Sequence, residues 1–134
     1  MDIKKEKVLC QKQWAKNKYL VLSYSSKIYL EIRTYLKQEE VSLEKVDKLI
    51  KQAINLPEDK GQVTNALHHV WGYFKKSATK EEKDNFFELI EDYHINKTTK
   101  EDLIEEVKKL LEKYPNTYLE HSTFINGEKD ETLA

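Results

Sequence analysis

The chain has 134 residues and a formal net charge of −1, with 35% charged and 39% hydrophobic residues. This length suits one domain that buries a single core. No apolar run approaches the ~20 residues of a membrane span, and the charged N-terminus lacks the apolar segment of a signal peptide, so we expect a cytoplasmic protein without a membrane partner. The single cysteine, Cys10, excludes an internal disulfide and cannot ligate an iron-sulfur cluster unaided.

Helical patterns begin near the N-terminus and follow one another with short breaks. We predict a first helix over residues 4–22, a second over 25–37 and a third over 42–55, with Ser42 as the N-cap of the third. The serines at 23–26 leave open whether the first two helices are separate or form one bent helix, because serine can cap a helix or stay within it.

Residues 60–76 predict a central helix with one apolar face, formed by Val63, Leu67, Val70 and Phe74. The neighbouring stripe carries small and polar residues, namely Lys60 or Gly61, Asn65, His69 or His68, Gly72 and Lys76. A glycine inside a helix costs about 1 kcal/mol relative to alanine. Gly72 in this stripe therefore indicates close approach by another backbone or by a ligand.

Two capping boxes mark the later helices. Thr79 with Glu82 begins a fifth helix, and Thr99 with Asp102 begins a sixth in a related way. Pro115 ends the sixth helix, and the segment after it is expected to add a short helical turn. The whole pattern, with only three Gly and two Pro, predicts an all-α, compact single-domain bundle of five to seven helices over residues 1–125, followed by a flexible tail over 126–134.

Five separated motifs resemble the YbgA-like family, a helical domain of unknown function. They are Trp14-Ala15-x-x-Lys18-Tyr19, Tyr29, Lys60-Gly61-x-x-x-Asn65, His69-x-x-Gly72-Tyr73-Phe74-Lys75 and Tyr114-Pro115-x-x-Tyr118-Leu119. The resemblance runs from about Lys12 to Leu119 and identifies 1–125 as a YbgA-like helical domain. It departs at the end, where Asn126-Gly127-Glu128-Lys129 replaces a proline-rich, basic finish.

This resemblance implies a domain that occurs alone or joined to the C-terminal side of an iron-sulfur desulfidase domain, which removes sulfur from thiolated uracil or uridine. In such fusions the helical domain is the candidate for holding the tRNA. Because this chain has one cysteine, any such cluster is expected on a separate desulfidase, which becomes the expected protein partner.

Charge divides unevenly along the chain. Residues 1–38 hold nine Lys or Arg against three acids, and residues 60–80 hold four Lys and no acid. Residues 39–59 carry three Lys against six acids, and residues 81–134 hold seven Lys against fifteen acids. If the first helices pack beside the central helix, the two basic segments are expected to form one electropositive face; the alternative is that the lysines only decorate solvated faces.

Aromatic and basic side chains are interleaved in these segments. Trp14 and Lys18 share a helix face, which suits stacking on a base while its phosphate is bound, although packing at a helix seam is the alternative. His69 is read either as a hydrogen-bonding residue or as a structural one. Tyr114 and Tyr118 are read mainly as a hydrophobic stop for the last helices.

We therefore predict a non-catalytic RNA-binding domain, with tRNA as the ligand, no cofactor, no metal and no catalytic residue. The predicted site comprises Trp14, Lys18, Tyr19, Lys60, Gly61, Asn65, His69, Gly72, Lys75 and Lys76. One alternative is a small enzyme or a nucleotide- or phosphate-binding protein with a Lys, Asn and His pocket on the central helix. Another is a protein-interaction bundle that docks a basic partner on its acidic half. A concave pocket around Asn65 and His69 would favour the enzyme, and the oligomeric state is left open.

Overall fold

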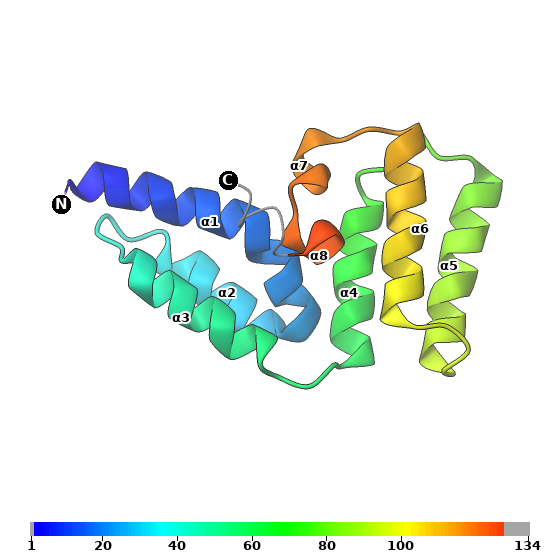
Figure 1. The fold of residues 1–134 in the computed structure, drawn as a ribbon, viewed down its shortest axis with the longest axis horizontal. Helices are drawn as coiled ribbons and strands as arrows, with labels where there is room; N and C mark the ends of the chain where they lie inside the picture. Colours follow the sequence, from blue (N-terminus) through cyan, green and yellow to red (C-terminus); the bar gives the residue numbers. More distant parts are fainter. Residues whose placement is uncertain (1, 128–134) are drawn as a thin grey trace.

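The computed structural model describes residues 2–127 and confirms the all-α fold (Figure 1). Within these residues there are eight helices and no strand: α1 (Ile3–Tyr24), α2 (Ser26–Tyr35), α3 (Leu43–Ile54), α4 (Lys60–Trp71), α5 (Lys80–His94), α6 (Lys100–Lys113), α7 (Thr117–Glu120) and α8 (Thr123–Asn126). The last two are single turns, so the six longer helices fit the predicted bundle. None of the helices in this part of the chain is both long and apolar enough to cross a membrane.

Helix α1 is shared between two hydrophobic clusters. Helices α2 and α3 lie along it on one side, whereas α4 packs directly against its C-terminal part and stands side by side with α6 and α5 (Figure 1). The single turn α8 also contacts α1. Cys10 and Val21 of α1 are buried in the smaller cluster with α2 and α3. Tyr19 and Leu22 are buried in the larger cluster with α4 to α8. Because one helix contributes to both clusters, α1 holds the two parts of the domain together.

Ser25 separates α1 from α2, which answers the question that the serine run left open. Its backbone is extended, with φ −159° and ψ 109°, and its side chain accepts a hydrogen bond from the Ile28 backbone N–H. The next residue, Ser26, donates its backbone N–H to the Gln62 side chain at 2.8 Å. The break therefore turns the chain, and a contact with α4 holds the start of α2 in place.

The central helix is shorter than the sequence predicts. Helix α4 ends at Trp71, and Gly72 is its C-cap, with φ −52°. The backbone N–H groups of Gly72, Tyr73 and Phe74 each bond to the carbonyl three residues earlier, which tightens the chain into turns. The predicted apolar face is nevertheless correct: Val63, Leu67, Val70 and Phe74 are each at most 1% exposed.

The C-terminal segment docks on α1 through a buried polar contact. Thr123 donates its hydroxyl to the Asn17 side-chain oxygen at 2.8 Å, and the same hydroxyl lies 3.1 Å from the Lys16 carbonyl oxygen. Asn17 in turn donates to the Gln13 carbonyl oxygen at 2.9 Å. Asn126, where the predicted tail begins, is the last residue of α8, and residues 128–134 of that tail lie outside the described residues.

Candidate functional site

The structure brings together tyrosines from four of the motifs that are far apart in the sequence. Tyr19 of α1 and Tyr73, just after α4, share a hydrogen bond between their hydroxyls at 3.0 Å. The Tyr73 ring stacks on Tyr118 of α7 with centroids 6.0 Å apart and planes at 20°, and Tyr19 meets Tyr118 edge-on at 6.2 Å. Tyr29 is partly buried and packs against the same hydrophobic cluster as Tyr19 and Tyr118. We call these four residues the tyrosine cluster.

Lys18 lies over the tyrosine cluster. Its Nζ is 5.3 Å from the ring centroid of Tyr19 and 5.4 Å from that of Tyr118, distances at which an ammonium is attracted to the ring faces. Among residues 2–127, Lys18 forms no ion pair. Lys18 is a half-buried residue whose ammonium therefore lies beside aromatic rings and pairs with no carboxylate of the described residues.

The hydroxyl of Tyr118 is buried and has no hydrogen-bond partner among the described residues. An unpaired buried hydroxyl of this kind costs about 1 to 3 kcal/mol. Burial raises the pKa of Tyr118 to about 12, and burial together with the hydrogen bond to Tyr73 raises the pKa of Tyr19. Both phenols are therefore neutral at physiological pH, and the Tyr118 hydroxyl can act as a hydrogen-bond donor.

Trp14, which the sequence offers as a stacking platform, packs partly inside the protein. Its ring is half-buried against the smaller cluster and lies 5.3 Å from the Tyr29 ring at 49°. The packing role at a helix seam is thus observed, whereas stacking of a base on Trp14 stays a prediction.

Two predicted site residues at the start of α4 have structural partners. Lys60 donates to the Tyr93 carbonyl oxygen at 2.8 Å and lies 4.1 Å from the centroid of the Tyr93 ring, so it ties the beginning of α4 to the end of α5. Gly61 is exposed, and a Cβ there would meet the carboxylate of the N-cap residue Asp59 at 3.3 Å. A side chain at position 61 would crowd the Asp59 cap, so the helix cap itself accounts for this glycine.

The rest of the polar stripe of α4 is exposed. Asn65 and His69 lie on the outer face of the helix, and neither side chain forms a hydrogen bond with another described residue. Gly72 is also exposed, and the atom nearest to a Cβ placed there is the His69 carbonyl oxygen at 3.1 Å. The close backbone approach predicted at Gly72 therefore comes from its own preceding turn.

Lys75 and Lys76 follow Tyr73 in the turns after α4, and both are exposed. The hydrogen bond between Tyr73 and Tyr19 places the end of α4 against α1, one residue from Lys18. This contact supports a shared basic surface. That the side chains of Lys18, Lys75 and Lys76 lie on it together stays a prediction.

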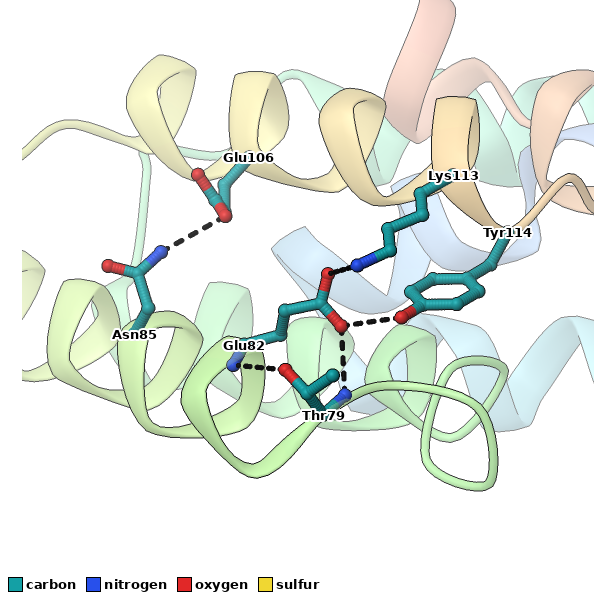
Figure 2. Close-up of polar contacts among 6 residues, drawn as sticks. All are labelled: Thr79, Glu82, Asn85, Glu106, Lys113 and Tyr114. Carbon is teal, nitrogen blue, oxygen red and sulfur yellow. Dashed lines mark hydrogen bonds and ion pairs between the residues drawn. The ribbon is translucent and has the colours of Figure 1, made fainter.

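A second polar cluster lies between α5 and α6, beside a surface hollow of about 410 Å³. Glu82 accepts hydrogen bonds from the Tyr114 hydroxyl at 2.6 Å, from the Thr79 backbone N–H at 2.8 Å and from Lys113 at 3.1 Å (Figure 2). These bonds, with that from Tyr114 contributing most, lower the pKa of Glu82 from 4.5 to about 2. The carboxylate is fully engaged in joining the start of α5 to the end of α6, which is a structural role.

This arrangement predicts acid sensitivity. Because the folded-state pKa of Glu82 lies below its ordinary value of 4.5, its stabilisation is fully present above about pH 4.5 and is lost as the pH falls toward 2. Thermal melts of the wild type should therefore fall more steeply over this pH range than those of Glu82→Gln. Glu88→Gln, on the exposed surface of the same helix, serves as the control and should follow the wild type. Parallel curves for wild type and Glu82→Gln would contradict the assignment.

Sequence reasoning missed how the tyrosines gather. It placed Tyr19 in the ligand site but read Tyr118 mainly as packing and left Tyr73 and Tyr29 without a site role. One signal in the sequence could have indicated this cluster: all four tyrosines fall in motifs that carry the same family resemblance.

Comparison with known proteins gives one match. The family model described as "Protein of unknown function (DUF1722)" matches residues 18–127, which is most of the chain and includes Lys18 and the tyrosine cluster. Neither the curated proteins nor the solved structures contain a match.

Proposed function

The chain belongs to the DUF1722 family, and we propose that it is a non-catalytic RNA-binding domain with tRNA as its ligand. The observation that carries this proposal is Lys18, whose ammonium has no ion pair within the described residues and lies over two rings of the tyrosine cluster. A cation beside aromatic rings is the combination that binds a phosphate and stacks on its base.

Residues around Lys18 supply further aromatic and basic groups that can contact RNA. Tyr73 is 37% exposed at the edge of the tyrosine cluster, so part of its ring is open to a base. Lys75 and Lys76 follow it on the exposed turns, where they can meet the next phosphates of a strand.

The resemblance to YbgA-like domains supplies the finer part of the proposal. In this reading the domain holds a tRNA that carries thiolated uridine and presents it to a desulfidase on a separate chain. The desulfidase would bring the iron-sulfur cluster, since Cys10 here is fully buried and burial raises its pKa.

The enzyme alternative has less support. Asn65 and His69 are exposed and make no hydrogen bond to each other or to a neighbouring base among the described residues, whereas nucleophilic and acid-base catalysis use such ordered pairs. Glu82, the carboxylate with the strongly lowered pKa, is already bonded to three partners.

Mobility shift of tRNA across a salt series tests the proposal. Wild-type protein should shift tRNA at low salt, with an affinity that falls as salt rises. Replacing Lys75 and Lys76 together by alanine should weaken binding of all tRNAs alike and flatten the slope of log affinity against log salt by up to about one unit per lost phosphate contact.

Lys97 and Lys109 provide the matched control, because both are exposed lysines in the acidic half of the chain. Replacing this pair by alanine removes the same charge and should leave the salt slope unchanged. An equal loss for the two pairs would place the binding surface elsewhere, and a wild-type protein that shifts no tRNA at low salt would refute RNA binding.

A further inference from the structure

We infer that the Tyr118 hydroxyl and the Lys18 ammonium together bind a phosphate group of a nucleotide, with the Tyr73 ring as a movable cover. This inference rests on the proposed function and names the group that the tyrosine cluster recognises.

The Tyr118 hydroxyl is buried and unpaired in the described part of the chain. It is the one buried side-chain polar atom without a hydrogen-bond partner within residues 2–127. Tyr114, four residues earlier, shows the ordinary arrangement, because its hydroxyl donates to Glu82 at 2.6 Å. A phenylalanine at 118 would fill the same space without an unpaired hydroxyl, so the oxygen has no evident role in folding. An acceptor supplied by a ligand would give it one.

Lys18 lies 5.4 Å from the centroid of the Tyr118 ring, so an ammonium and a neutral hydroxyl belong to one small region. Both groups donate hydrogen bonds, and no carboxylate of the described residues pairs with Lys18. A site of donors with a positive charge selects an anion and disfavours a metal ion. Phosphate offers several acceptor oxygens and a negative charge.

The Tyr118 oxygen is covered in the free protein, so a ligand needs a way to reach it. Tyr73 stacks over the Tyr118 ring, with centroids 6.0 Å apart. It lies in the turns just beyond the end of α4, is 37% exposed, and has one side-chain hydrogen bond, to Tyr19. A change in the Tyr73 side-chain torsions would uncover the Tyr118 hydroxyl and leave the Tyr73 ring free to stack on the base of the same nucleotide.

The experiment compares Tyr118→Phe with Tyr114→Phe, because each loses one hydroxyl and keeps its ring. Thermal melts should show Tyr118→Phe at or above the melting temperature of the wild type. Tyr114→Phe should melt several degrees lower, because it loses the hydrogen bond that its hydroxyl donates to Glu82.

Calorimetric titrations with adenosine and uridine 5′-monophosphates, the two nucleosides and inorganic phosphate then measure binding. We expect wild type and Tyr114→Phe to bind the monophosphates more tightly than the nucleosides. Tyr118→Phe should bind the monophosphates roughly tenfold more weakly, as for one lost hydrogen bond to a charged group. Lys18→Met should show a similar loss. This variant keeps the buried hydroxyl and removes the ammonium, so it tests the second group of the site separately.

Three outcomes would overturn the inference: a Tyr118→Phe melting temperature as low as that of Tyr114→Phe, equal monophosphate affinity in wild type, Tyr118→Phe and Lys18→Met, or no binding of any of these ligands to the wild type. In each case the tRNA mobility shift of the wild type still decides the proposed function independently. Monophosphate binding that depends on Tyr118, without any tRNA shift, would instead support the phosphate site and refute the RNA-binding function.

Discussion

Phe86→Ala is expected to lower the free energy of unfolding by about 3 to 5 kcal/mol. Phe86 is fully buried in the larger cluster, stacked on Trp71 with ring centroids 5.1 Å apart and planes at 21°. It also meets Phe87 edge-on at 5.6 Å. Removing the ring deletes both aromatic contacts and leaves a cavity between α4 and α5, whose surroundings relax only partly. Chemical denaturation followed by circular dichroism measures the loss.

Phe87→Ala is the matched control for this substitution. Phe87 is only partly buried, although it touches Trp71 and Phe86 as well as His68. Water can fill much of the space that its ring leaves, so the loss of stability should be clearly smaller. Equal losses at positions 86 and 87 would show that the assignment of Phe86 to the core is wrong.

Leu67→Ala is expected to lower the free energy of unfolding by about 2 to 5 kcal/mol. Leu67 is fully buried at the centre of the apolar face of α4, between Val63 and Val70. Most of the inter-helix contacts of α4 are with α1, so a cavity here weakens the joint between the central helix and the helix that both clusters share. Denaturant titration monitored by tryptophan fluorescence reports the change.

Leu30→Ala provides the comparison for Leu67, because it removes the same atoms from a leucine that is 53% exposed on α2. Its effect should stay within about 0.5 kcal/mol, as for surface substitutions in general. A Leu67 variant as stable as the Leu30 variant would show that the buried face of α4 is misassigned.

Helix positions and most caps could be predicted from the sequence because their causes are local. Ser42 caps α3, and the capping boxes of Thr79 with Glu82 and Thr99 with Asp102 form as predicted. Each depends on a side chain that reaches a backbone group three residues away. The spacing of apolar residues likewise predicts which face of α4 is buried.

The apolar pattern of the sequence does not fix every helix boundary, because at some positions two local backbone structures fit it equally well. The apolar spacing continues through Phe74, yet α4 ends at Trp71 and Phe74 reaches the core from a turn. At Ser25, capping of α2 was as compatible with the sequence as a bent helix, and the extended backbone with the nearby Gln62 contact decided between them.

The sequence by itself determined the all-α class, the order of the long helices and their buried faces, since these follow from periodicity and local hydrogen bonding. The tertiary structure alone decided which polar residues meet. In the folded chain Lys60 donates to the carbonyl of Tyr93, and Trp14 packs against Tyr29. Tyr73 stacks on Tyr118, and Lys18 lies over the rings of Tyr19 and Tyr118. The contacting residues lie up to 100 positions apart in the chain, as for Lys18 and Tyr118. Their contacts follow from how α1, α4 and α7 pack together, and no local pattern encodes that geometry.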